Sequence, residues 1–372
     1  MENNYPLIIF GAGASLDSFD TFSRFENIKS INLLKWVPPL TNNIFDRTKF
    51  EHILERYPEA NQLAVEDFRV SNEFSLEDLI TNTLIIRAVK NPIWYKRLIS
   101  FRFYLQHLFS GVSRNFFHLT NNYGRLISLI NEHSKERACF VNFNYDLLFE
   151  RHLNHIAYTS NIDNYVQGSF KVIKIHGACN WIRSVGFGDT NDADFKNGKE
   201  FSLDNAEDIL LSEISDTTQL NLPEIMTDSP DWDYFDPIND GFPAHQDRVK
   251  YYVPDLALPM QGKRNYVCPK KHIDILEKEM ELIDRVIIIG WKAGDDFLIN
   301  LMKTKLRPNT PIIVVSPSAA GEIASKLRNN GLSANSIKCT FTDFIKNKYC
   351  QEILSTSDMN VTMRKINSAA KI

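Results

Sequence analysis

The sequence of 372 residues lacks an apolar run that approaches the roughly 18 residues needed to cross a membrane. Its first residues, Met1 to Pro6, also lack the basic region and the long apolar run of a secretory signal. We therefore expect neither a membrane protein nor a classically secreted one, and we expect the chain to work in the cytoplasm.

Close cysteine pairs are absent as well. Zinc ribbons need closely spaced thiolates, so we expect no structural zinc and no metal. An odd number of scattered cysteines is typical of reduced thiols in a cytoplasm. The five cysteines, none of which belongs to a C-x-x-C pair, are Cys139, Cys179, Cys268, Cys339 and Cys350.

A large excess of one charge is missing from the chain as a whole, which carries 42 basic and 46 acidic residues. Residues 182–250 hold 16 acidic and 5 basic residues, so the remainder is basic overall. This balance does not indicate nucleic-acid binding. The basic remainder favours an anionic ligand.

Short apolar runs rich in β-branched residues are the main feature that is present. Continuous runs, rather than alternating ones, are typical of strands covered on both faces, as in a parallel sheet. Helical patterns over 295–306 and 319–329 follow two of them, which predicts an α/β fold with a Rossmann-like, mostly parallel sheet flanked by helices. The expected strands are Leu7–Phe10, Ala138–Phe143, Phe170–Ile175, Arg285–Ile289, Pro311–Val315 and Ile337–Phe341.

Two long gaps interrupt this rhythm. The first has helical periodicity from Leu76 to Ala88, from Trp94 to Phe109 and from about Phe116 to Ile130. The second has the turn-rich composition of loops. The expected organisation is a core of 1–15, 136–181 and 266–350, a helical insertion of 16–135, an acidic loop-rich insertion of 182–265, and a tail or short terminal helix of 351–372.

A glycine-rich loop, Gly11-Ala12-Gly13-Ala14-Ser15, follows the first expected strand. Small residues allow a phosphate to approach the backbone N–H groups at a helix start. The ordinary dinucleotide fingerprint needs a third glycine where this chain has Leu16, and an acid that ends a second strand about 20 residues on. An ordinary dehydrogenase is therefore not supported, and a tight turn without a ligand is the alternative.

Polar side chains follow the next two expected strands. Asn144 and Asp146 come after the second, and His176 comes after the third. Ligands of open α/β sheets lie at the carboxyl ends of the strands, and a histidine there is a candidate general base. Asn144 is suited to hold a water or a ribose hydroxyl and Asp146 to orient a neighbour. Helix capping is the alternative for both, and a structural role is the alternative for His176.

Two further loops end strands at the same expected edge. Gly290 to Asp296 follows the fourth strand, where Asp295 is suited to a ribose hydroxyl or to a helix N-cap. Ser316 follows the fifth strand and is suited to the same two roles.

In this order, the motifs resemble those of the sirtuin-like family, the silent-information-regulator type of NAD-consuming domain. The glycine loop is similar to that family's G-A-G-x-S. Phe143-Asn144-Tyr145-Asp146 resembles its T-x-N-Y-D, with Asn142 and Phe143 in place of the T-x. Lys174 to Gly177 resembles K-L-H-G, and Ile288 to Asp295 resembles I-I-G-Y-S-x-x-D, with Lys292 where a serine is frequent.

The resemblance implies NAD bound across the strand ends. It makes Asn144, His176 and Asp146 the expected catalytic residues. The zinc module of the family's deacetylases is missing, and together with the long helical segment this resembles the bacterial branch that destroys NAD in anti-phage defence. The residues expected around the cofactor are Gly11, Ala12, Gly13, Ala14, Ser15, Asn144, Asp146, Gly177, Gly290, Trp291, Asp295 and Ser316.

The expected function is thus NAD+ glycohydrolysis to nicotinamide and ADP-ribose. A sensor that binds NAD or ADP-ribose without cleaving it, and an ADP-ribosyltransferase, are the alternatives. Since a free NAD hydrolase would poison its own cell, we expect gating by homo-oligomerisation or by a separate defence partner such as an ATPase. No membrane or nucleic-acid partner is indicated.

Overall fold

The fold is seen in a computed structural model of the chain. It describes residues 5–23, 36–64, 76–81, 92–115, 121–134, 136–157, 159, 161–186, 218–220, 250–259 and 267–369.

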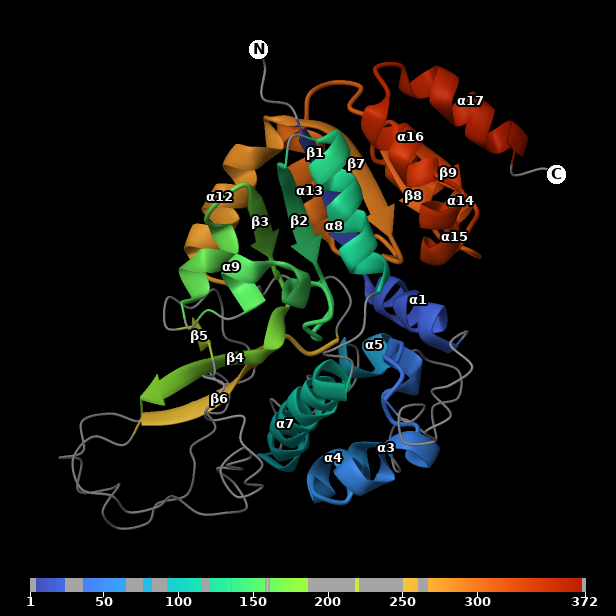
Figure 1. The fold of residues 1–372 in the computed structure, drawn as a ribbon. Coiled ribbons are helices and arrows are strands. Elements are labelled where there is room, and N and C mark those ends of the chain that lie inside the picture. The colour runs from blue at the N-terminus through green and yellow to red at the C-terminus, as the bar shows by residue number, and fades with distance from the viewer. Residues whose placement is uncertain are drawn as a thin grey trace, which may run out of the picture.

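The centre of the molecule is a six-stranded sheet in the order β3-β2-β1-β7-β8-β9 (Figure 1). Every neighbouring pair is parallel. All residues of β1, β2 and β8 are buried, which is why these strands read as continuous apolar runs. The strands are β1 (Tyr5–Phe10), β2 (Ala138–Asn142), β3 (Phe170–Ile173), β7 (Ile283–Ile289), β8 (Ile312–Val315) and β9 (Ala334–Ile337).

Helices cover both faces of this sheet (Figure 1). One face carries α1 (Ala12–Ser23), α8 (Asn122–His133), α15 (Phe341–Lys346) and α16 (Tyr349–Ser355), which contact one another. The other carries α12 (Lys270–Met280) and α13 (Asp296–Lys305). At the C-terminal end, α14 (Ala320–Asn329) packs on β8 and β9, and α17 (Met359–Ala369) packs on α16 and β9.

The predicted fold class is confirmed by this sheet, and five of the six expected strands lie within two residues of their predicted bounds. The sixth is displaced: β9 ends at Ile337, where the sequence predicts a strand start. The Thr340 hydroxyl accepts a hydrogen bond from the Asp343 N–H and caps α15, which begins at Phe341. The cap therefore turns the end of the predicted strand into a helix start.

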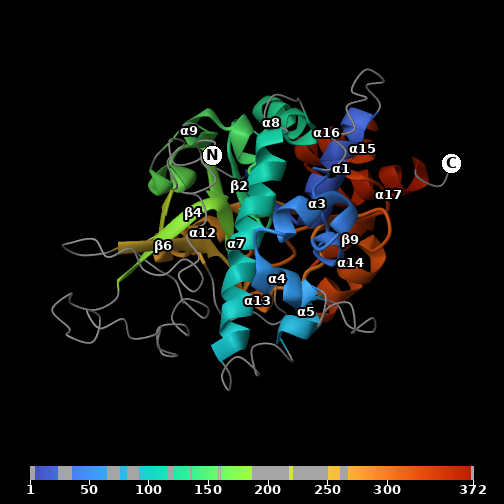
Figure 2. The same cartoon turned by 90° about the horizontal axis from the view of Figure 1, so that it is seen from below.

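A second group of helices lies below the sheet, away from its strands (Figures 1 and 2). The long helix α7 (Pro92–Asn115) packs on α3 (Arg47–Leu54) and α4 (Pro58–Gln62), and the short elements α5 (Leu76–Leu79) and η1 (Thr41–Asn43) contact each other. Pro92 stands at the first position of α7, where a missing N–H leaves no helix bond unmade. Helix α7 also reaches β4 and β6.

A small antiparallel sheet, β5-β4-β6, follows the third strand of the chain. It consists of β4 (Gly177–Gly186), β5 (Thr218–Leu220) and β6 (Lys250–Leu256). Turns and loops rather than long elements were expected over 182–265, and the sequence did not predict the strands that lie within it. They form because Ile182 to Gly186 pair with Lys250 to Pro254, which lie 64 to 72 residues further along the chain. Most of 182–265 lies outside the described residues.

Short helices fill the connection from β2 to β3. They are η4 (Glu150–His152), α9 (Asn154–Ala157) and η5 (Ile162–Val166). The predicted division into core and insertions stays a prediction. Within 16–135, however, α1 and α8 pack on α15 beside the sheet, whereas α3, α4 and α7 pack on each other.

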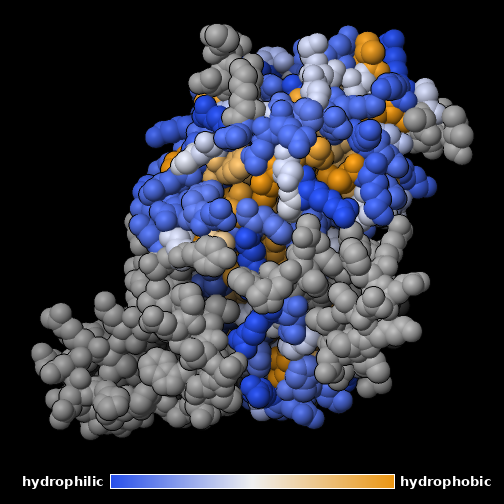
Figure 3. All heavy atoms as spheres, in the orientation of Figure 1, coloured by the Kyte–Doolittle hydropathy of each residue, from blue (hydrophilic) through white to orange (hydrophobic). Residues whose placement is uncertain are grey.

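The surface is mainly hydrophilic in the face shown by Figure 3, with hydrophobic side chains visible in the middle of its upper half. Among the described residues, no helix combines the length and apolar character needed to cross a bilayer.

Candidate functional site

The strand order reverses between β1 and β7. From β1 the chain continues to β2 on one side, and from β7 it continues to β8 on the other. Ligands of open α/β sheets bind at such a switch point, outside the carboxyl ends of the strands. The loops that leave this point are Gly11 to Ser15 after β1 and Gly290 to Asp295 after β7.

These two loops are in direct backbone contact. The Gly11 N–H donates to the Ile289 carbonyl at 3.0 Å, and the Gly13 N–H donates to the Gly290 carbonyl at 3.2 Å. A Cβ on Gly11 would lie 2.5 Å from the Gly290 oxygen. Gly290 itself has a φ of +66°, and its Cβ would lie 2.3 Å from the nitrogen of Ala14. The close approach of the loops therefore requires glycine whether or not a phosphate binds.

The side chain of Asn144 contacts Ser15, the last residue of the glycine loop. The Asn144 Nδ2 donates to the Ser15 Oγ at 3.0 Å and to the Tyr123 hydroxyl at 3.2 Å. The Ser15 Oγ and the Tyr123 hydroxyl are 2.8 Å apart. All three residues are at most 6% exposed, so their polar groups satisfy one another in place of water.

A buried ion pair holds the backbone of the loop that carries Asn144. The Lys174 Nζ bonds to the Glu150 Oε1 at 2.7 Å and donates to the Asp146 carbonyl at 2.9 Å. Glu150 also accepts from the Asn142 Nδ2 at 2.9 Å, and the Asn142 Oδ1 accepts the Asn144 N–H at 3.0 Å. Side chains at the ends of two neighbouring strands thus fix the backbone of the Asn144 loop.

Asp146 lies inside this cluster with 2% of its surface exposed. Its Oδ1 accepts the Leu148 N–H at 3.1 Å. Burial raises the pKa of Asp146 above its usual value, while the positive charge of Lys174 lowers it. Asp146 therefore closes a turn of the loop. It does not cap the next helix, because η4 has Phe149 at its N-cap and no side-chain cap.

Hydrogen bonds also join helix α7 to the loop that carries Asn144. The Leu147 N–H donates to the Ser113 Oγ at 2.9 Å, and the Arg151 guanidinium donates to the Ser113 carbonyl. The second helical group is therefore attached to the site by specific hydrogen bonds. The same loop is also joined to the segment after β6, because the Tyr145 hydroxyl donates to the Ala257 carbonyl at 2.5 Å.

His176 lies in the turn between β3 and β4. Its Nε2 is 3.5 Å from the Asp295 Oδ2, and the two side chains are 14% and 3% exposed. The Asp295 Oδ1 accepts the Leu298 N–H at 2.9 Å as the N-cap of α13. Asp295, expected to contact a ribose or to cap a helix, therefore caps the helix and also faces the candidate base.

Aromatic rings join His176 to the Asn144 loop. The Phe143 ring meets the His176 ring edge-on with centroids 4.8 Å apart, and it stacks on Trp291 at 5.0 Å and 7°. Phe143 directly precedes Asn144 in the chain, so the loop that carries Asn144 also supplies the ring that packs on His176. Trp291, predicted to contact the cofactor, is 6% exposed and stacks on the same ring.

Gly177 and Ser316 both have local structural reasons for their identity. A Cβ on Gly177, whose φ is +71°, would lie 2.0 Å from the Asp255 oxygen on β6. The Ser316 Oγ accepts the Ala319 N–H at 3.2 Å and closes the turn before α14. Their predicted cofactor contacts stay predictions.

Sequence reasoning did not assign a role to Tyr123, Glu150 or Lys174 at this edge. Lys174 stands in the quoted K-I-H-G segment, and that segment was its signal. Tyr123 lies on the buried face of an amphipathic helix, a pattern that predicts burial but not a polar partner. Within the described part of the chain, no cluster of histidine, cysteine and carboxylate side chains suits a metal ion.

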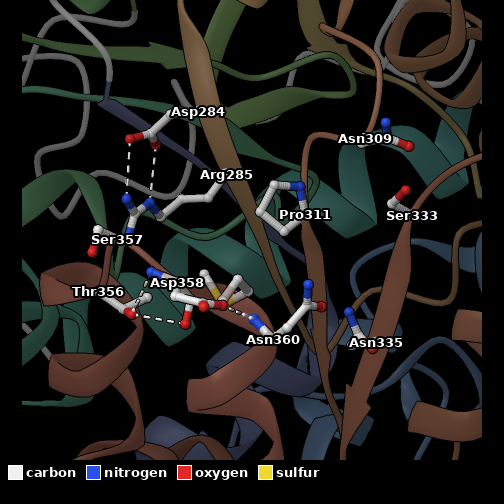
Figure 4. A pocket seen from close by; sticks show the side chains of 11 residues that line it. Asp284, Arg285, Asn309, Pro311, Ser333, Asn335, Thr356, Ser357, Asp358 and Asn360 are labelled. Carbon is white, nitrogen blue, oxygen red and sulfur yellow. Dashed lines mark hydrogen bonds and ion pairs between the residues drawn. The ribbon is translucent and has the colours of Figure 1, made fainter.

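Away from the candidate site, a hollow lies at the opposite, amino edge of the sheet (Figure 4). It has a volume of about 720 Å³ and is lined by the starts of β7, β8 and β9 and by the segment before α17. Arg285 points to Asp284 with two hydrogen bonds of 3.0 and 3.1 Å. None of the predicted site residues lines it.

Comparison with known proteins gives distant structural similarity. No protein-family model matches the sequence, and no curated protein matches it. Among solved structures, the chain is similar to a Sir2 homologue in complex with NAD at 13% identity and a TM-score of 0.39, over 98% of this chain and 90% of that one. It is also similar to a structure that describes the mechanism and regulation of Sir2 enzymes, at 11% identity and a TM-score of 0.34, over 98% and 93% of the two chains. Function is therefore inferred below from the chain's own residues.

Proposed function

We propose that this chain hydrolyses NAD+ to nicotinamide and ADP-ribose. The observation that carries the proposal is that Asn144, which bonds to Ser15 of the glycine loop, and His176 follow the neighbouring strands β2 and β3 beside the switch point of the sheet. The same residues carry the resemblance to the sirtuin-like family. A dinucleotide that lies across the strand ends would place its phosphates at the start of α1 and its reacting ribose near Asn144 and His176.

In the proposed reaction the bond between the ribose C1′ and the nicotinamide nitrogen breaks, and its electron pair leaves with nicotinamide. Positive charge builds on the ribose, as in other glycosyl transfers. A water oxygen forms the new bond to C1′. The water loses one proton, which His176 accepts as the base and passes to solvent. Base assistance of this kind is worth about 10²–10⁴-fold in rate.

Asn144 holds the water or the ribose. The hydrogen bonds that its side chain makes to other described residues both come from Nδ2, which leaves the carbonyl Oδ1 as the group that accepts a bond from the substrate. Asp295 faces the His176 ring and balances the charge that the imidazole gains with the proton. The loop from Gly11 to Ser15 holds the pyrophosphate, so that binding energy away from the reaction centre fixes the ribose.

The biological setting belongs to the same proposal. We place the enzyme in the cytoplasm, as the gated effector of an anti-phage defence system that depletes NAD+. All five cysteines are unpaired, as expected in a reducing compartment. Control by homo-oligomerisation or by a separate partner protein is required by the toxicity of unregulated hydrolysis. Contacts between α7 and the Asn144 loop give such control a route to the site.

The test is NAD+ consumption by purified protein, with products separated by chromatography, beside His176→Ala. We expect nicotinamide and ADP-ribose in equal amounts from the wild type, and a loss of at least about 10²-fold in the variant. ADP-ribose attached to a macromolecule would indicate a transferase instead. Binding of NAD+ without turnover, at all protein concentrations, would indicate either the sensor alternative or an enzyme that needs its separate partner.

A further inference from the structure

Three buried polar side chains form a closed cluster at the carboxyl edge of the sheet. The Ser15 hydroxyl is 2.8 Å from the Tyr123 hydroxyl, which accepts from the Asn144 Nδ2 at 3.2 Å. Asn144 also donates to Ser15 at 3.0 Å. The three members come from two helices and one loop that are far apart in sequence.

Both hydroxyl oxygens of this cluster accept from the amide of Asn144. Each hydroxyl has one proton to donate and two lone pairs to accept with. One proton lies between the oxygens of Ser15 and Tyr123, and each oxygen still accepts an N–H of Asn144. Both donors of the Asn144 amide are therefore used within the cluster.

An asparagine side chain has a donor end and an acceptor end of nearly the same shape. Two isolated hydroxyl groups would accommodate either end, because a hydroxyl both donates and accepts. Here the two hydroxyl oxygens bond to each other, which leaves at most one hydroxyl proton for an amide oxygen, whereas both oxygens can accept from the NH₂ end of Asn144. The NH₂ end therefore fits best against Ser15 and Tyr123. The carbonyl end then faces away from them.

We propose that Tyr123 is a positioning residue which, with Ser15, fixes the amide of Asn144 so that its carbonyl oxygen faces the substrate. The proposal rests on the function proposed above. A flipped amide would offer N–H groups where the proposed reaction needs an acceptor for the water or the ribose hydroxyl. Fixing the amide before substrate binds avoids that reorganisation during the reaction.

The position of Tyr123 is determined from several sides. Its N–H is capped by the Asn121 Oδ1 at 3.0 Å, and the Nδ2 of its neighbour Asn122 donates to the Thr342 Oγ1 at 2.9 Å. Three rings enclose its own ring, with centroid distances of 4.9 to 5.7 Å. These rings belong to Phe10, Phe149 and Phe341. The hydroxyl is thus held by packing that does not depend on the substrate.

The experiment compares Tyr123→Phe with Tyr5→Phe. Tyr5 is also buried, and its hydroxyl accepts from Arg137 at 3.3 Å at the opposite end of β1. Each variant removes one hydroxyl and keeps the ring. We expect Tyr123→Phe to lower kcat about tenfold, with KM within about twofold of the wild type, and Tyr5→Phe to leave both unchanged.

A second measurement does not need turnover. In protein labelled with ¹⁵N at asparagine, the Asn144 NH₂ signals are assigned by their loss in Asn144→Asp. Tyr123→Phe is expected to shift these signals and speed their exchange with water, and Tyr5→Phe is not. The absence of NAD+ hydrolysis by the wild type bears on the proposed function alone, while this arm still decides the positioning. Unchanged Asn144 signals, or equal kcat in Tyr123→Phe and the wild type, would overturn it.

Discussion

At the carboxyl edge of the sheet, buried polar side chains bond to one another, whereas at the amino edge a partly exposed arginine bonds to its neighbour and to distant main-chain carbonyls. Ser15 bonds to the side chains of Tyr123 and Asn144, more than 100 residues along the chain. Arg285 bonds to the Asp284 carboxylate and to the carbonyls of Ile353 and Leu354, and it lines an open hollow. Both arrangements join elements that are far apart in sequence, but only the first does so through side chains alone.

The two edges also differ in how far their charged side chains are buried. The Lys174 and Glu150 side chains are 0% and 2% exposed, and those of Arg285 and Asp284 are 15% and 25% exposed. A charge that is out of contact with water depends on its partner much more than one at the surface. The two edges therefore provide matched pairs of substitutions for testing what each arrangement contributes.

The largest expected effect comes from removing one charge at each edge. Lys174→Met leaves Glu150 buried without its cation, and we expect a loss of about 3–5 kcal/mol in the free energy of unfolding. Arg285→Met, at the more exposed pair, is expected to lose about 1–2 kcal/mol. Urea denaturation of both variants measures the difference, and equal losses would show that the buried pair has no special weight.

The next effect compares two glycines with positive φ. Gly290 at the carboxyl edge has φ +66°, and a Cβ added there would lie within 3 Å of backbone atoms of the glycine loop. Gly331, which precedes β9, has φ +84° and nothing within 4 Å of an added Cβ. We expect Gly290→Ala to lower stability by about 3 kcal/mol or more and Gly331→Ala by about 1 kcal/mol. Thermal unfolding of the pair separates the steric contact from the backbone conformation that they share.

The smallest effect concerns a single charge. Asp295→Asn keeps a good N-cap for the Leu298 N–H but removes the negative charge beside His176. We expect kcat for NAD+ to fall about tenfold with little change in stability. Asp284→Asn, which removes a carboxylate at the amino edge, is expected to leave kcat unchanged. The same kcat in both variants would remove Asp295 from the proposed mechanism.

The sequence predicted the central sheet well because its strands are buried on both faces. Runs such as Leu7–Phe10 and Ile312–Val315 have no polar residue to confuse the pattern. It did not predict β4 and β6, since their pairing joins Ile182 to Pro254 across a long segment and leaves no local signature. Periodicity describes what a strand buries and says nothing about which distant strand pairs with it.

The site was predictable to a similar extent. The ends of parallel strands share one edge, so Ser15, Asn144 and His176 could be assigned to it from the strand pattern alone. Tyr123 could not, because its role depends on how α8 packs on the sheet. Nor could the contact of Gly13 with Gly290, since the glycine pattern fits a phosphate and a close backbone approach equally well.

The strand order also determines at what stage of synthesis each part of the sheet can form. β1 (Tyr5–Phe10) leaves the ribosome well before one of its two neighbours, β7 (Ile283–Ile289), has been translated. Pairings of such sequence separation close slowly, and the edge of β1 stays open until they do. A nascent chain that ends before Gly290 has neither the Gly290 loop nor Asp295. The residues of the candidate site therefore come together only after this late segment has been translated.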